Sequence, residues 1–66
     1  QTPSVYMSTS GGLWRVIWQG QPLCADTTRE RAYICAVRYG IREPSSLPVW
    51  NGDAGRFETS DGRALG

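Results

Sequence analysis

The stretch that decides the fold is residues 26–41, which read DTTRERAYICAVRYGI. Signals at both ends of this stretch predict a helix over Thr28–Tyr39. Thr27, with Glu30 three residues later, matches a capping box at a helix start. Gly40 is typical of the position just past a helix end, because glycine adopts the left-handed backbone conformation found there. We therefore expect one short helix near the middle of the chain.

The two sides of this predicted helix differ in character. Small or aromatic residues at helical spacing form the expected inner face: Ala32, Cys35, Ala36 and Tyr39. This spacing predicts one buried stripe, and its small side chains would let the helix lie close to a sheet. The opposite side carries Arg31, Ile34 and Arg38. The sequence suggests no structural role for these three residues.

Two strands joined by a tight turn are expected before the helix. Residues 13–19 are rich in β-branched and aromatic side chains, as strands are. Alternation would place Trp14, Val16 and Trp18 toward the core and Arg15 and Ile17 outward. Gln19-Gly20 supplies the turn. The second strand, Gln21–Ala25, contains Pro22, which predicts a sheet edge because proline lacks the N–H donor.

The segment after the helix predicts a second hairpin. Residues 42–48 form an irregular connection, and residues 47–50 and 56–59 flank the turn-forming run NGDAG at positions 51–55. Either Val49 or Trp50, together with Phe57, would add to the core.

The predicted order is β-β-α-β-β, a single small α+β domain over residues 13–59. It would contain a mostly antiparallel sheet of three or four strands with one helix packed on one face. Residues 1–12 are expected to form a flexible N-terminal arm, and residues 60–66 a flexible tail. Residues 1–6 fit a cloning remnant, since Met7 begins a plausible reading frame. The alternative is the trimmed start of a secreted protein.

The residue types argue against an enzyme and against a bound metal or cofactor. The chain has no histidine, which removes the commonest general base and the commonest metal ligand. Its carboxylates are scattered over predicted caps, turns and tail rather than paired. Asn51, Asp53 and Gly55 superficially match a calcium loop, but the bidentate glutamate at the required spacing is missing. We expect no catalytic residue, no cofactor and no metal.

Cys24 and Cys35 leave two interpretations open. Free cysteines commonly behave as small buried apolar residues, and this is the favoured interpretation. The alternative is a disulfide, because a strand end and a facing helix can bring the two Cα atoms within bonding reach.

The charge pattern bears on origin and location. All seven basic residues are arginine, and the formal net charge is only +1. Arginine without lysine fits the codon usage of a GC-rich genome and favours a bacterial, phage or plasmid source. The chain has neither an apolar run long enough to cross a membrane nor a visible signal peptide. We therefore expect a cytoplasmic protein with no membrane partner.

The functional hypothesis is a small non-catalytic binding or regulatory module that acts by protein–protein contact, with self-association as one form of that contact. The alternative hypothesis is a nucleic-acid-binding domain that uses the arginine-lined helix side and the second hairpin. Six residues are candidates for contact with the partner or nucleic acid: Arg15, Arg31, Ile34, Arg38, Trp50 and Arg56. Tryptophan and arginine are enriched among interface hot spots.

Overall fold

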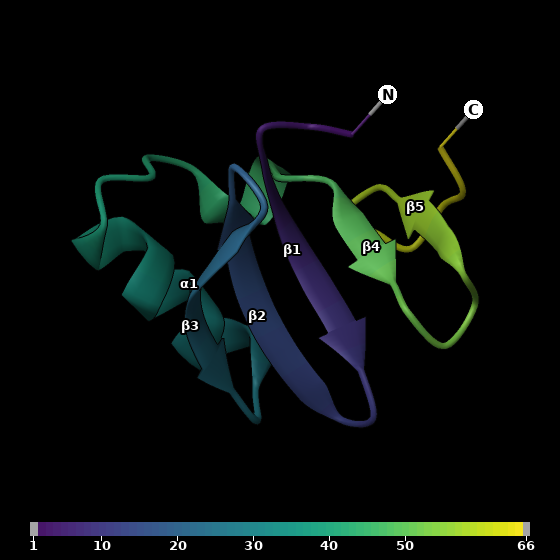
Figure 1. Ribbon diagram of the computed structural model, residues 1–66, viewed down its shortest axis with the longest axis horizontal. Helices are drawn as coiled ribbons and strands as arrows, with labels where there is room; N and C mark the ends of the chain where they lie inside the picture. Colours follow the sequence, from purple (N-terminus) through teal and green to yellow (C-terminus); the bar gives the residue numbers. More distant parts are fainter. Residues whose placement is uncertain (1, 66) are drawn as a thin grey trace.

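The computed structural model describes residues 2–65, which form five strands, one α-helix and one 3-10 helix (Figure 1). The elements in chain order are β1 (Val5–Ser10), β2 (Leu13–Trp18), β3 (Gln21–Asp26), α1 (Arg29–Arg38), η1 (Pro44–Ser46), β4 (Val49–Asn51) and β5 (Arg56–Glu58). No helix among these residues is both long and apolar enough to cross a membrane.

The five strands form one sheet in the order β3-β2-β1-β4-β5. Neighbouring strands are antiparallel except β1 and β4, which run parallel. The α+β class is confirmed, but the expected three or four mostly antiparallel strands become a five-stranded mixed sheet. The extra strand is β1, which joins the two predicted hairpins. A parallel pair needs a long crossover, and the chain from β3 through α1 and η1 to β4 supplies it.

The core lies where three neighbouring strands meet α1. Met7, Val16 and Val49 are cross-strand partners, and they pack with Ala32 and Ala36 of the helix. Met7 retains only 1% of its exposure. Residues 5–10, expected to belong to a flexible arm, thus form the central strand. The prediction missed it because its serines and threonines read as loop, whereas only every second side chain has to be apolar in a strand.

The helix is one residue shorter at each end than the predicted Thr28–Tyr39, and its cap also differs. Thr28, not Thr27, is the N-cap, and its side chain accepts a hydrogen bond from the backbone N–H of Arg31. The C-terminal end agrees with the prediction. Gly40 has a φ of 92° and donates to the carbonyl of Val37, and the next N–H donates to the carbonyl of Ala36. These two bonds make a Schellman motif.

A disulfide joins the helix to the sheet. Cys24 of β3 and Cys35 of α1 are bonded, with their Cα atoms 6.5 Å apart. The favoured expectation of two free buried cysteines is therefore wrong, and the alternative is correct. The bond ties α1 to an edge strand, where only one neighbouring strand holds β3 in place.

The C-terminal residues fold back along β5. The N–H of Leu65 donates to the carbonyl of Phe57, and the N–H of Thr59 donates to the carbonyl of Arg63. Glu58 and Ala64 form an isolated antiparallel bridge. Residues 60–65, expected to be a flexible tail, are therefore hydrogen-bonded to the edge of the sheet, and residues 1 and 66 lie outside the described range.

Candidate binding surfaces

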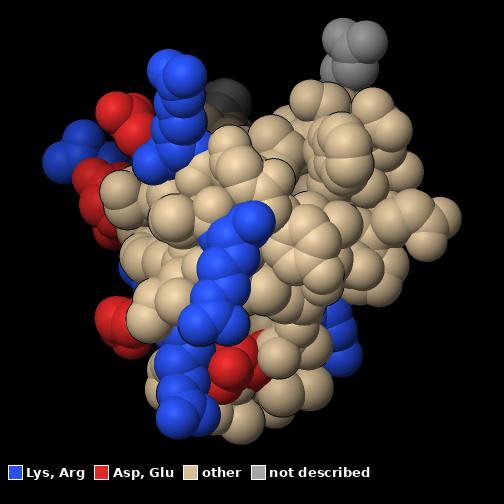
Figure 2. Space-filling model, turned by 90° about the vertical axis from the view of Figure 1, so that its left-hand side faces the viewer, with Lys and Arg blue, Asp and Glu red and all other residues tan. Residues whose placement is uncertain are grey.

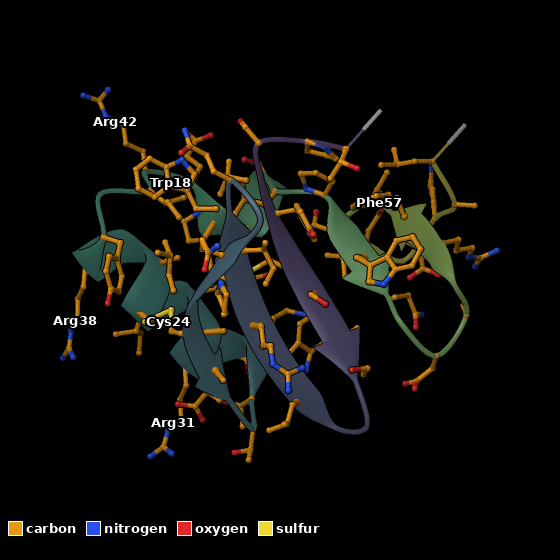
Figure 3. The ribbon with its side chains drawn as sticks, viewed as in Figure 1. Trp18, Cys24, Arg31, Arg38, Arg42 and Phe57 are labelled. Carbon is orange, nitrogen blue, oxygen red and sulfur yellow. A yellow bond between two sulfur atoms is a disulfide. The ribbon has the colours of Figure 1, made fainter. Side chains whose placement is uncertain are left out.

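The six predicted contact residues do not converge on one surface. Arg31, Ile34 and Arg38 lie along α1. Arg15 and Trp50 are both partners of Ser8 in the sheet, so they share the face opposite the core. Arg56 lies on edge strand β5. Figure 3 shows the helix arginines on one side of the molecule and Phe57 of β5 on the other.

The carboxylate of Glu58 engages Arg56. The two side chains form an ion pair with Nε 2.8 Å from Oε2, and Nδ2 of Asn51 donates to Oε1 at 3.3 Å. The Arg56 hydrogen bond, helped by Asn51, holds the pKa of Glu58 below its ordinary value, although burial acts in the opposite direction. Arg56 therefore has a structural role in the second hairpin.

Three other arginines also have partners within the fold. The guanidinium of Arg29 lies 4.5 Å from the ring centroid of Trp14 and donates to the carbonyl of Ser60. Arg31 pairs with Asp26 at 3.8 Å, and Arg63 pairs with Asp61 at 3.5 Å. Among residues 2–65, the arginines without an ion pair or a side-chain hydrogen bond are Arg15, Arg38 and Arg42. The guanidinium groups of these three arginines could therefore pair with acidic groups of a binding partner.

An apolar pocket lies between the helix end and the first hairpin. We call it the Trp18–Tyr39 pocket, and its lining residues are Val5, Trp18, Leu23, Tyr39, Gly40 and Ile41. Its volume is about 230 Å³. Trp18 is 51% exposed and Tyr39 is 60% exposed. Both were expected to face the core. Trp18 is the last residue of β2, and Tyr39 is the C-cap, where the chain leaves the helical path.

Two of the unpaired arginines are next in sequence to residues that line this pocket. Arg38 precedes Tyr39, and Arg42 follows Ile41. In Figure 3 the guanidinium groups of Arg38 and Arg42 project outward on the same side of the molecule as Trp18. Figure 2 shows that basic side chains are spread over this side, with acidic groups and uncharged surface between them. Arg38 also lies in the last turn of α1, where a cation is favoured by the helix dipole.

The second candidate surface is the sheet face that points away from α1, here called the open sheet face. Its strand residues include Tyr6, Ser8, Leu13, Arg15, Ile17, Trp50 and Phe57. Three of them form an aromatic cluster: the ring of Phe57 lies 5.2 Å from Tyr6 and 5.0 Å from Trp50, both edge-on. Phe57 was expected in the core, whereas it lies on this opposite face as the partner of Trp50.

Neither surface contains a cluster of metal-ligating side chains among residues 2–65. Within the described range, no three cysteine, aspartate or glutamate side chains lie close enough to hold a metal ion, and both cysteines are in the disulfide. Comparison of the chain with protein-family models, with curated proteins and with solved structures gives no match.

Proposed function

We propose that this protein is a non-catalytic module that binds another protein through the Trp18–Tyr39 pocket. The observation that supports the proposal most directly is the exposure of two large aromatic side chains around an apolar hollow. Aromatic residues and arginine are the residue types most enriched at the energetic centres of protein interfaces. A hollow of about 230 Å³ is smaller than the roughly 300–1,000 Å³ of small-molecule sites. It suits one apolar side chain of a partner.

The charges beside the pocket define the partner further. Arg38 and Arg42 have no ion pair among residues 2–65, and acidic Glu43 follows Arg42. Both guanidinium groups are free of ion pairs among residues 2–65, so they could bind an acidic group on the partner, because forked guanidinium groups bind carboxylates well. The expected partner is therefore a protein segment with an aromatic or aliphatic anchor flanked by aspartate or glutamate.

The disulfide affects where this binding takes place. Disulfides persist in oxidising compartments and are uncommon in the cytosol. The Cys24–Cys35 bond therefore argues against the cytoplasmic location expected from the sequence. We propose that the protein works in an oxidising compartment, as an accessory protein of bacterial, phage or plasmid origin.

A displayed library of random peptides tests the proposed binding. We expect selection on the wild-type protein to enrich peptides with one apolar anchor next to acidic residues. Trp18→Ala should weaken the enriched peptides about 30-fold or more, which corresponds to a hot spot of about 2 kcal/mol. Reversing charge in Arg38→Glu and Arg42→Glu together should weaken binding further and reduce its salt dependence.

Arg63→Glu is the matched control, because Arg63 is exposed and lies outside the pocket. It should leave peptide affinity unchanged. The proposal fails if no peptide is enriched over an unrelated protein, or if the enriched peptides bind the Trp18→Ala variant as well as the wild type while its circular dichroism shows an intact fold.

A further inference from the structure

The open sheet face brings together side chains that lie far apart in the sequence. Tyr6 on β1 is the partner of Ile17 on β2, and Ser8 is the partner of both Arg15 and Trp50. Trp50 is in turn the partner of Phe57. The helix packs on the other face, against Met7, Val16 and Val49. Tyr6, Ile17, Trp50 and Phe57 therefore stay partly exposed instead of entering the core.

The aromatic cluster on this face surrounds a shallow pocket. Tyr6, Trp50 and Phe57 line it together with Thr2, and its volume is about 230 Å³. The rings meet edge-on, with interplanar angles of 80° and 64°. Such an arrangement presents ring faces and ring edges in one hollow. A flat aromatic group that entered it would contact all three side chains.

The charge of the face restricts what can cover it. Arg15 is its one charged strand residue and has no ion pair among residues 2–65. The strand carboxylates Asp26 and Glu58 are the partners of Trp14 and Val49, which places them on the opposite, helix-bearing face. A second copy joined face to face would therefore bring two arginines together without a carboxylate between them. Burying unpaired charge in this way is costly.

We propose that the open sheet face binds single-stranded nucleic acid. One base would enter the pocket between Tyr6, Trp50 and Phe57, where stacking does not depend strongly on base identity. Arg15, two strands away from Trp50 across β1, would contact a phosphate. Aromatic residues on an exposed sheet are a known way to hold unpaired bases. This site lies on different residues from the Trp18–Tyr39 pocket, so the two proposals stand or fall separately.

Fluorescence anisotropy of labelled oligonucleotides tests the proposal with the disulfide intact. The probes are an eight-nucleotide oligothymidylate and an oligouridylate of equal length, which separate DNA from RNA. A duplex of the same length is the third probe, since paired bases cannot enter the pocket. At low salt we expect single strands to bind with a Kd of about 1–100 µM and the duplex to bind more weakly.

Two variants separate stacking from charge. Trp50→Ala should weaken single-strand binding between about 5-fold and about 150-fold, the effect of losing one stacked base. Because this change also removes the contact with Phe57, Arg15→Gln is the second variant. Its side chain does not enter the core, and it should lower the slope of log K against log salt by about 0.7. Arg31→Gln, an exposed arginine on the helix side, should change neither quantity.

Three results would overturn the proposal. The first is the absence of any anisotropy change for either single strand at about 100 µM protein and low salt. The second is binding that is equal for polyglutamate and for the oligonucleotide, which would indicate an acidic protein segment instead. The third is a chemical-shift map on the wild-type protein in which the oligonucleotide moves the amides of α1 and leaves Ser8, Arg15 and Trp50 unchanged.

Discussion

Removing the Cys24–Cys35 disulfide should destabilise the protein by about 2.8 kcal/mol. The bond joins residues 11 positions apart, and a cross-link that closes a loop of this length reduces the entropy of the unfolded chain by about 9 cal/mol/K. A 66-residue domain is expected to have about 3–10 kcal/mol of total stability. The disulfide therefore accounts for a large fraction of it, as expected for a chain with a small core.

Thermal unfolding followed by circular dichroism, with and without reductant, measures this effect. At about 4–8 °C per kcal/mol for a domain of this size, reduction should lower Tm by about 11–22 °C. A Cys24→Ala, Cys35→Ala double variant is the control. It should unfold near the Tm of the reduced wild type and should not respond to reductant.

Two outcomes would contradict the reasoning. One is a Tm that does not change on reduction although mass spectrometry shows that the bond was present and then lost. The other is that both thiols react with an alkylating reagent in protein that has not been treated with reductant. The two cysteines would then not be bonded in solution.

Further predictions concern the caps, turns and carboxylates. Because the pKa of Glu58 is lowered in the folded state, its stabilising effect is present at neutral pH and is lost as pH falls through that pKa. The urea midpoint of Glu58→Gln should therefore fall less than that of the wild type between about pH 6 and about pH 3. Thr28→Ala should cost about 1 kcal/mol in urea unfolding, whereas Thr27→Ala should cost less than about 0.5 kcal/mol; equal effects would refute the assigned cap. A Cβ on Gly52 would lie 2.8 Å from Cβ of Ser10, so Gly52→Ala should cost about 1–3 kcal/mol, and Ser10→Gly in the same chain should restore part of that loss.

Local sequence patterns predicted much of the fold. The helix, its glycine C-terminus and both hairpin turns follow from short-range rules of capping and turn formation. The cap at Thr28 instead of Thr27 is an error of one residue, because both threonines can accept the capping hydrogen bond. The small inner face of Ala32 and Ala36 was also correct, since helical periodicity reports directly on burial.

The central strand and the aromatic cluster could not be predicted in the same way. The strand β1 is recognisable only by its pairing with β2 and, in parallel, with β4. Tyr6 meets Trp50 and Phe57 because β1 lies between the two hairpins. No local pattern in residues 5–10 indicates that pairing. The exposure of Tyr39 and Trp18 was missed for a related reason. Periodicity predicts the direction in which a side chain points, but it does not predict whether a neighbouring element covers that side chain.

The central strand makes the two proposed binding surfaces depend on one alignment. Val5 lines the Trp18–Tyr39 pocket, and its neighbour Tyr6 points to the opposite side of the sheet into the aromatic cluster. A slip of β1 by one residue would exchange the two side chains between the faces and move Met7 out of the core. Both surfaces would then be lost in a single event. Proteolysis or mutation that detaches this short segment from the sheet should abolish binding at both surfaces. The two hairpins would then lack the strand that joins them.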